Sequence, residues 1–194
     1  LDQSVGLLRG PKGTQVNIMV MRNGERKKFL ITRDIVTIQF LRTKMMRKKI
    51  GYIKISLFGG EVAEQFYREM KNLDAAGAQS IIIDLRDNGG GKLYSVLDMC
   101  SWFTKTIKPY ATILYTKGRT GPLQDSSVSG FSVGKFQHKH IVVLQNGNSA
   151  SASEIFSGYL KHETGAVIVG EKSFGKGIVQ TLIELSNRGE IASH

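Results

Sequence analysis

The sequence predicts an α/β domain with a largely parallel sheet, because strand-like and helix-like segments alternate along most of the chain. Residues 80–85 form an isoleucine-rich run, as expected for a strand buried on both faces. Residues 61–73 carry apolar side chains at helical spacing. Two unusual loops, at residues 88–91 and 147–151, follow predicted strands, and α/β sheets form their sites at such carboxyl ends.

The N-terminal elements predict a β-hairpin. Strand-like runs at residues 16–20 and 29–31 flank Arg22-Asn23-Gly24-Glu25, and Asn-Gly between two strands is the strongest short hairpin signal. Residues 7–13 upstream indicate a helix end and a turn. The hairpin is too small to hold a core of its own, so we expect it to belong to a larger module or to pack on the rest of the chain.

The remaining elements follow from periodicity and from turn residues. Gly77 stands where a helix-ending glycine is expected. Residues 122–135, rich in Gly, Ser and Asp, predict a surface loop. Strands are expected at residues 50–57, 80–85, 112–116, 141–145 and 166–169, and helices at 61–73, 93–103 and 153–162.

The composition indicates a globular protein with a basic surface. The chain has 194 residues, 41% of them hydrophobic, and a formal net charge of +11. The densest basic run, residues 42–49, comes without a nucleic-acid-binding signature, which favours solvated surface over an anion or membrane contact. The single cysteine, Cys100, excludes an internal disulfide and is expected to be buried. No apolar run approaches membrane-spanning length, and no motif indicates a catalytic metal or another cofactor.

Ser151 is a candidate nucleophile at the start of a predicted helix. Glu154 follows three residues later, so the pair also fits a capping box in which Ser151 only caps the helix. A serine at a helix start has backbone N–H groups and the positive end of the helix dipole close by, and both favour an oxyanion. Ser149 and Ser153 are rivals that spacing alone does not separate.

Lys176, between two glycines, is the candidate general base. To accept a proton it must be neutral, whereas a free lysine titrates near ~10.4. Burial against Phe174, Ile178 and Val179 would lower its pKa. Gln180 is placed either to orient the amine or to face solvent. The alternative is an ordinary solvated lysine in a turn.

The glycine-rich stretch Asn88-Gly89-Gly90-Gly91 predicts a tight turn or an oxyanion hole, since it matches neither the P-loop nor the dinucleotide pattern. A serine–histidine pair is the competing arrangement. His162 lies about three turns along the helix that Ser151 starts, and so does not reach back to it. His138 and His140 remain open, both as bases and as a weak metal-binding pair.

Four motifs follow one another between residues 50 and 180. They are Gly51-Tyr52-Ile53-Lys54-Ile55, Asp84-Leu85-Arg86-Asp87-Asn88-Gly89-Gly90-Gly91, Ser149-Ala150-Ser151-Ala152-Ser153-Glu154-Ile155 and the segment 169–180 that contains Phe174-Gly175-Lys176-Gly177. In their order and spacing they resemble the C-terminal processing peptidases, also called tail-specific proteases. The resemblance implies a Ser–Lys endopeptidase on a ClpP/crotonase-like α/β core that cleaves proteins at or near unstructured, apolar C-terminal tails.

The same resemblance implies a role for each site residue. Ser151 is the nucleophile, Lys176 the general base and Gln180 the residue that orients the lysine. The backbone N–H groups of Gly90 and Ala152 form the oxyanion hole. One departure is that the family usually has Asn-Pro-Gly-Gly where this chain has Asn88-Gly89-Gly90-Gly91, which makes the turn more flexible.

The resemblance also divides the chain. Residues 7–31 are similar to the second half of the family's PDZ domain, so we expect a partial PDZ domain at residues 1–34 and a peptidase core at 35–194 that is incomplete at its C-terminal end. The family suggests an extracytoplasmic location, in the periplasm or cell envelope. It leaves room for a homo-oligomer, an activating adaptor or peripheral membrane association, and it implies no nucleic acid.

Two other functional classes stay open from the sequence. The first is a catalytically inactive peptide-binding or scaffold module on the same fold, with Ser151 as a helix cap and Lys176 solvated. The second is an anion or nucleic-acid binder, which rests on the net charge of +11 alone.

Overall fold

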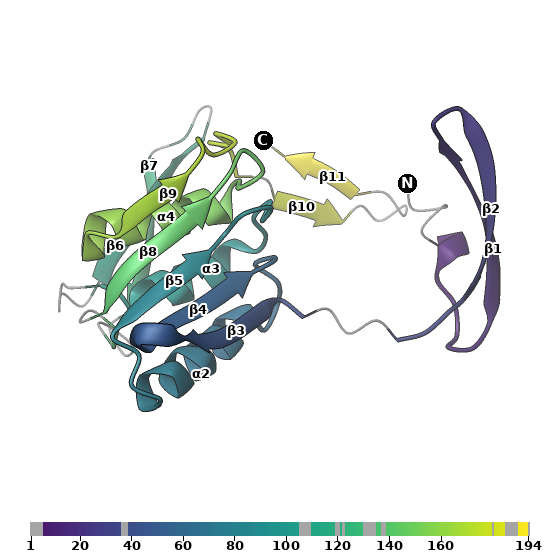
Figure 1. Ribbon diagram of the computed structural model, residues 1–194. Helices are drawn as coiled ribbons and strands as arrows, with labels where there is room; N and C mark the ends of the chain where they lie inside the picture. Colours follow the sequence, from purple (N-terminus) through teal and green to yellow (C-terminus); the bar gives the residue numbers. More distant parts are fainter. Residues whose placement is uncertain are drawn as a thin grey trace. The chain divides into compact units, whose positions relative to one another are not determined.

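The computed structural model describes residues 6–35, 39–104, 110–118, 121, 123–129, 135–136, 139–179, 181–184 and 190–193 (Figure 1). The chain forms two compact units, Leu1–Ile38 and Gln39–His194. Each unit is built around its own strands, and each is described by itself.

The first unit contains the predicted hairpin. Strands β1 (Gln15–Arg22) and β2 (Glu25–Thr32) pair antiparallel, and Arg22 pairs with Glu25 across the turn. Asn23 and Gly24 have φ of 54° and 80°, as a two-residue type I′ turn requires. The hairpin prediction is confirmed, with longer strands than expected. None of the described residues of this unit is fully buried, which agrees with the expectation that the hairpin holds no core of its own.

A five-stranded sheet forms the centre of the second unit, in the order β3-β4-β5-β8-β9. The last four of these strands run parallel, which confirms the predicted parallel sheet. The first pairs antiparallel at the edge, so part of the basic run 42–49 is a strand. The bounds are β3 Leu41–Met46, β4 Ile50–Ile55, β5 Ser80–Asp84, β8 His140–Gln145 and β9 Val167–Gly170.

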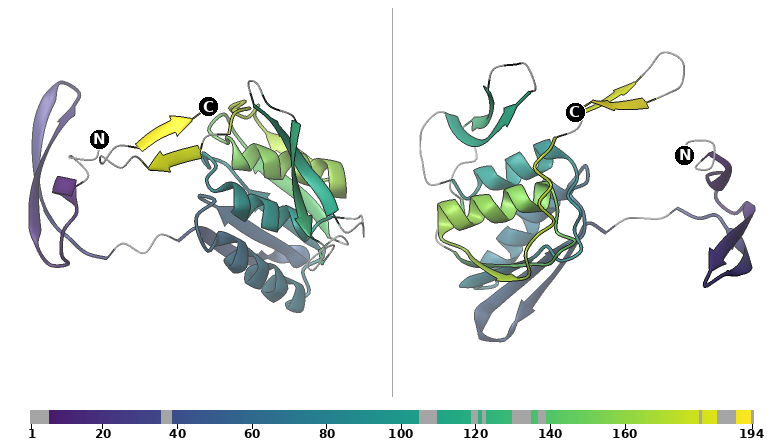
Figure 2. Two further views of the ribbon diagram at one scale, coloured as in Figure 1. Left: turned by 180° about the vertical axis from the view of Figure 1, so that it is seen from behind. Right: turned by 90° about the horizontal axis from the view of Figure 1, so that it is seen from above.

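Helices α2 (Val62–Ala75), α3 (Leu93–Ser101) and α4 (Ala152–Thr164) cover one face of this sheet, as the views in Figures 1 and 2 agree. The core lies between the helices and that face. Cys100 is buried there as predicted, and burial raises the pKa of its thiol. Fully buried side chains that form this core include Ile53, Ile81, Ile83, Phe58, Phe66, Phe103, Phe156 and Leu160.

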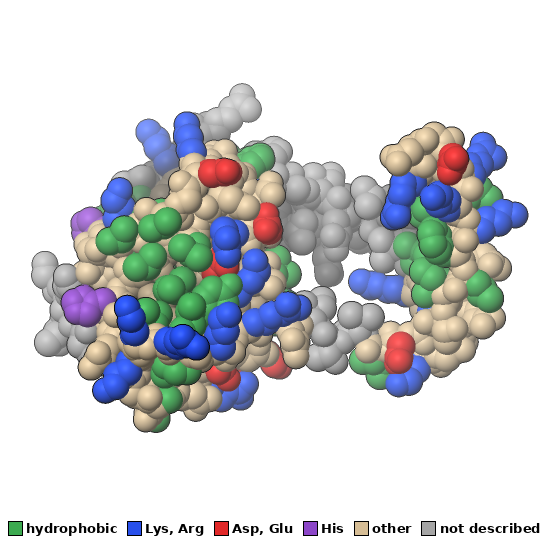
Figure 3. Space-filling model, viewed as in Figure 1, with side chains coloured by type: hydrophobic (Ala, Val, Ile, Leu, Met, Phe, Trp, Pro, Cys, Tyr) green, Lys and Arg blue, Asp and Glu red, His purple; other side chains and the backbone are tan. Residues whose placement is uncertain are grey.

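The opposite face of the sheet is open among the described residues. Ile82 and Val142 are only half-buried, while Val167 and Val169 are 59% and 47% exposed. In Figure 3, apolar side chains gather over these strands with lysines and arginines spread around them. The expectation that residues 80–85 are buried on both faces is therefore only partly met: Ser80 and Ile82 are half-buried and Asp84 is buried on the open face, because the three helices cover only the other face.

Two further pairs of strands lie outside the main sheet. Strand β6 (Tyr110–Lys117) pairs antiparallel with β7 (Leu123–Ser129), and β10 (Thr181–Glu184) pairs with β11 (Glu190–Ser193). The predicted loop at residues 122–135 is thus partly wrong. The residues of β7 are poor strand formers, but β6 offers them an edge for backbone pairing. The strand predicted at residues 112–116 exists, although not in the parallel sheet.

Gly77 ends helix α2 as predicted. Its φ is +84°, and its N–H donates to the Asp74 carbonyl (2.8 Å), while the Ala78 N–H donates to the Leu73 carbonyl (2.9 Å). The chain can therefore turn sharply into β5. Across the described residues, no helix combines the length and the apolar character needed to cross a membrane.

Candidate active site

Two loops at the carboxyl ends of adjacent parallel strands form the candidate site. The glycine loop (residues 86–91) follows β5, and the serine loop (residues 146–151) follows β8. The Ala150 N–H donates to the Asn88 carbonyl (3.0 Å), and Ser149 Oγ donates to the Leu85 carbonyl (2.8 Å). The expectation that two strand ends deliver both loops to one edge of the sheet is confirmed.

Of the three candidate serines, Ser149 and Ser153 are buried, and their hydroxyl groups donate to backbone carbonyls just before or within the glycine loop. Ser153 Oγ donates to the Asn88 carbonyl (2.8 Å), and both side chains are at most 1% exposed. Ser151 is half-buried and precedes α4 with φ 54° and ψ −115°. A non-glycine residue rarely adopts a positive φ, and such strain concentrates at functional sites. Ser151 is therefore the serine of this group that the fold leaves near the surface.

Glu154 joins the serine loop to the lysine loop (residues 171–179). Its Oε2 accepts from the backbone N–H of Ser151 (2.8 Å) and of Lys176 (2.9 Å). Its Oε1 accepts from Ser173 Oγ and from the Gly175 N–H, both at 2.7 Å. Burial by itself raises the pKa of Glu154. The four hydrogen bonds lower it by a larger amount, so the net shift is downward. The backbones of Ser151 and Lys176 thus meet at one carboxylate oxygen.

The sequence predicts Glu154 only as the capping-box partner of Ser151. The lysine-loop residues that Glu154 contacts lie 19 to 22 positions further along the chain. That loop also shows no helical or strand periodicity from which its position could be predicted. The S/T-x-x-E spacing signals the bond to the Ser151 N–H. Nothing in the spacing signals the other three bonds.

The lysine loop holds Lys176 half-buried, and the Phe174 N–H donates to the Ser149 carbonyl (3.0 Å). Phe174, Ile178 and Val179 are 69%, 53% and 47% exposed. The apolar enclosure that these side chains were expected to form around the amine is therefore not present in this conformation. Gln180, the predicted orienting residue, lies outside the described residues.

Gly90, in the glycine loop, approaches the serine loop closely. Its φ is +106°, and a Cβ at this position would lie 2.8 Å from the Ala150 carbonyl oxygen, 2.9 Å from Ser151 Cβ and 3.0 Å from the Ala152 nitrogen. The two predicted oxyanion-hole amides are thus neighbours. In this conformation the Gly90 N–H donates to Asn88 Oδ1 (2.9 Å), while Asn88 Nδ2 donates to the Ile55 carbonyl (2.9 Å).

An ion pair supports the start of the glycine loop. The fully buried Asp84 carboxylate accepts from Arg86 Nε (2.9 Å) and Nη2 (2.7 Å) and from the Tyr52 hydroxyl (2.6 Å). Burial raises the pKa of Asp84, but the hydrogen bonds from Arg86 and Tyr52 prevail and lower it to about 2. The carboxylate therefore stays ionised through the neutral range and fixes the chain where β5 ends.

We expect Asp84 to stabilise the fold in a pH-dependent way. Because its folded pKa of about 2 lies below the ordinary 3.8, its contribution is full above about pH 4 and is lost as the pH falls toward 2. Asp84→Asn should lower the free energy of unfolding by about 2 kcal/mol at neutral pH and flatten the loss between pH 4 and pH 2. Urea unfolding of both proteins at several pH values measures this. An unchanged acid profile in the variant would contradict it.

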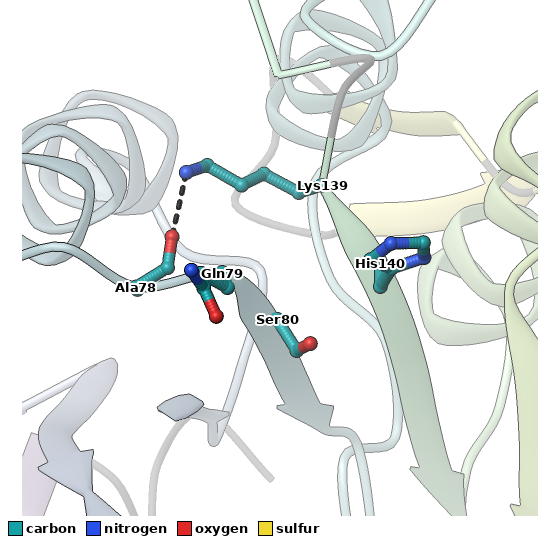
Figure 4. Close-up of a pocket in the computed structure, with 5 residues that line it drawn as sticks. All are labelled: Ala78, Gln79, Ser80, Lys139 and His140. Carbon is teal, nitrogen blue, oxygen red and sulfur yellow. Dashed lines mark hydrogen bonds between the residues drawn. The ribbon is translucent and has the colours of Figure 1, made fainter. Parts of the chain in front are cut away.

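The alternative histidine base at position 140 is too far from Ser151. His140 lies at the amino end of β8, where it lines a pocket with Ala78, Gln79, Ser80 and Lys139 (Figure 4). In this pocket, Lys139 Nζ donates to the Ala78 carbonyl (2.7 Å). Ser151 follows the other end of that strand, roughly 20 Å away at ~3.3 Å per residue. His138 is not among the described residues, and the described residues contain no group of His, Cys, Asp and Glu side chains able to hold a metal ion.

The comparisons with known proteins decide the family. The model of peptidase family S41 matches residues 49–194, most of the second unit. The chain belongs to peptidase family S41. In this S41 chain the half-buried Ser151 lies at the carboxyl edge of the sheet, between the end of β8 and the start of α4.

Named relatives and a solved structure agree with the S41 assignment. The chain is 33% identical over 99% of its length to the carboxyl-terminal-processing protease of Synechocystis sp., and 32% identical over 98% to the carboxy-terminal processing protease CtpB of Bacillus subtilis. It covers 45% and 40% of those proteins, so it spans somewhat less than half their length. The photosystem II D1 C-terminal processing protease shares the fold, with a TM-score of 0.66 at 24% identity over 94% of this chain and 50% of that one.

Proposed function

We propose that this S41 chain is the catalytic part of a Ser–Lys endopeptidase that cleaves proteins at or near their C-terminal tails. The observation that supports this most directly is the shared carboxylate of Glu154, which bonds the backbone of both Ser151 and Lys176. A nucleophile and a base on separate loops need such a connection if their side chains are to meet.

In the proposed reaction, Ser151 Oγ attacks the scissile carbonyl while the neutral Lys176 amine accepts its proton. Lys176 then returns that proton to the leaving amine, and water hydrolyses the acyl-enzyme by the same route. Gln180 orients the lysine. The oxyanion receives hydrogen bonds from the N–H groups of Gly90 and Ala152, at the positive end of α4.

Two local changes accompany this mechanism. The Gly90 N–H must turn from Asn88 Oδ1 toward the oxyanion, or share its hydrogen between them. The exposed apolar side chains near Lys176 must close over its amine and exclude water from it, because an apolar environment favours an uncharged group. A bound peptide with apolar side chains would provide that cover, because it would bury the same residues.

Exposed apolar side chains around the site support an apolar substrate. Phe174, Ile178 and Val179 lie on the lysine loop, Leu57 follows β4, and Tyr94 is in the first turn of α3. Substrates with unstructured, apolar C-termini would bury these groups on binding.

The rest of the proposal rests on the family likeness. We propose that residues 1–34 are part of a PDZ domain that binds substrate tails by strand addition, and that the second unit has a ClpP/crotonase-like core. An extracytoplasmic location, self-association or an activating adaptor, and contact with a membrane surface are consistent with this assignment. Nucleic acid is not among the proposed partners.

Cleavage of an unfolded protein with an apolar C-terminus tests the function. Ser151→Ala and Lys176→Ala should each lower the rate by at least about a thousandfold, because each removes one half of the proton-transfer pair. Lys172→Ala, an exposed lysine in the same loop, is the matched control and should cleave normally. Substantial activity in Ser151→Ala or Lys176→Ala, with the fold intact by circular dichroism, would overturn the proposal.

A further inference from the structure

We propose that Asp87 is a positioning residue that fixes the spacing between the glycine loop and the serine loop, and thereby between the Gly90 amide and Ser151. The inference rests on the proposed function, because it concerns how the oxyanion hole of that reaction is held in place. Asp87 is an exposed residue of the glycine loop, and the mechanism above gives it no chemical role.

The contacts of Asp87 run between the loops in both directions. Its Oδ1 accepts from Asn146 Nδ2 (2.8 Å) and from Asn148 Nδ2 (3.0 Å). In return, its backbone N–H donates to Asn146 Oδ1 (3.0 Å), which also accepts from the Asn148 N–H (3.2 Å). These bonds form a small closed network between the ends of β5 and β8.

The backbone at Asp87 restricts which residues suit this position. Its φ is +65°, in the left-handed region that glycine, asparagine and aspartate tolerate best. The Asn148 and Asn146 amides lower the pKa of its carboxyl, so it is ionised at neutral pH and accepts from both. The residue therefore combines a favourable backbone conformation with an acceptor aimed at the neighbouring loop.

Catalysis depends on this spacing because the oxyanion amides belong to different loops. Gly90 belongs to the glycine loop, whereas Ser151 ends the serine loop and Ala152 begins α4, and a Cβ on Gly90 would already lie 2.9 Å from Ser151 Cβ. A displacement of about 1 Å in such a site is enough to lower the rate ~100-fold. The buried bonds of Asn88 and Ser149 hold the inner parts of the loops, and Asp87 holds their exposed part.

Three variants separate hydrogen bonding from backbone strain. Asp87→Gly keeps the positive φ but removes the acceptor, Asp87→Asn keeps the φ and one acceptor oxygen, and Asp87→Ala loses both. In the structure a single oxygen, Asp87 Oδ1, accepts the bonds from both Asn146 and Asn148. The one amide oxygen of Asp87→Asn should therefore keep both bonds and preserve activity. We expect Asp87→Gly to lower kcat by about 10- to 100-fold with KM unchanged, Asp87→Ala to be at least as impaired, and Asp87→Asn to stay within about fivefold of the unmodified enzyme.

Steady-state cleavage of the unfolded substrate gives kcat and KM, and thermal unfolding of each variant gives stability. A role confined to stability would lower the unfolding temperature and leave kcat unchanged, which would overturn the inference, as would an Asp87→Asn variant as impaired as Asp87→Gly. The comparison with Ser151→Ala keeps the two proposals apart. If Ser151→Ala is inactive while Asp87→Gly is fully active, the function stands and the positioning role fails; if Ser151→Ala is active, the proposed function fails.

Discussion

Replacing Glu154 with glutamine is expected to lower kcat/KM by at least about a hundredfold, because each of its carboxylate oxygens accepts two hydrogen bonds. A glutamine has one acceptor oxygen, and its amide nitrogen would face two donors at the other position. One of the two pairs of hydrogen bonds must therefore break. Either the backbones of Ser151 and Lys176 lose their shared acceptor, or Ser173 and Gly175 lose theirs. We expect the free energy of unfolding to fall by only about 2–3 kcal/mol, since Glu154 is half-buried.

Glu163→Gln is a matched control for this variant. Glu163 is a half-buried glutamate near the other end of α4, where it contacts His162. Its replacement should leave cleavage within about twofold, because it lies far from both loops. Kinetic measurements on the two variants, with unfolding curves for each, test the role of the shared carboxylate. A Glu154→Gln enzyme with normal kcat/KM would show that Ser151 and Lys176 are aligned by other contacts.

Gly90→Ala should inactivate the enzyme by about 100- to 1,000-fold, comparable to removal of an oxyanion-hole donor. A Cβ at Gly90 would lie within 3.0 Å of the Ala150 oxygen, Ser151 Cβ and the Ala152 nitrogen, and φ is +106°. Since two of these are backbone atoms, the glycine loop itself must move away from Ser151.

Gly89→Ala provides the neighbouring control for Gly90→Ala. A Cβ on Gly89 would meet no atom within 4 Å, so this variant should keep its activity and, by restricting the unfolded chain, its stability. Cleavage rates and thermal unfolding of both variants make the comparison. If Gly90→Ala cleaved as fast as Gly89→Ala, the close approach of Gly90 to Ser151 would have no catalytic meaning.

The sequence predicts the parallel sheet and its helices well because each carries a clear period. The apolar spacing of residues 61–73 and the Asn23-Gly24 turn are local signals, and the structure forms both elements. Ser151 and Glu154 are likewise three residues apart, so their contact is readable as a capping box.

Features that depend on tertiary pairing are harder to predict from the sequence. Strand β7 is polar and becomes a strand only through its pairing with β6, and the half-open face of β5 reflects where three separate helices pack. The bonds of Glu154 to the lysine loop and of Asp87 to Asn146 and Asn148 join positions that are distant along the chain. No local spacing encodes them, although they join the loops that carry the candidate catalytic residues.

In the proposed reaction, Ser151 becomes a nucleophile because Lys176 accepts its proton. The most direct measurement is the pH dependence of covalent labelling by a serine-directed acylating probe, with the labelled residue identified by mass spectrometry. We expect labelling of Ser151 alone, which increases as the pH rises because the base must be deprotonated, and no labelling in Lys176→Ala. Equal labelling of Lys176→Ala, or an unlabelled Ser151 in the unmodified protein, would contradict it and favour an inactive binding module.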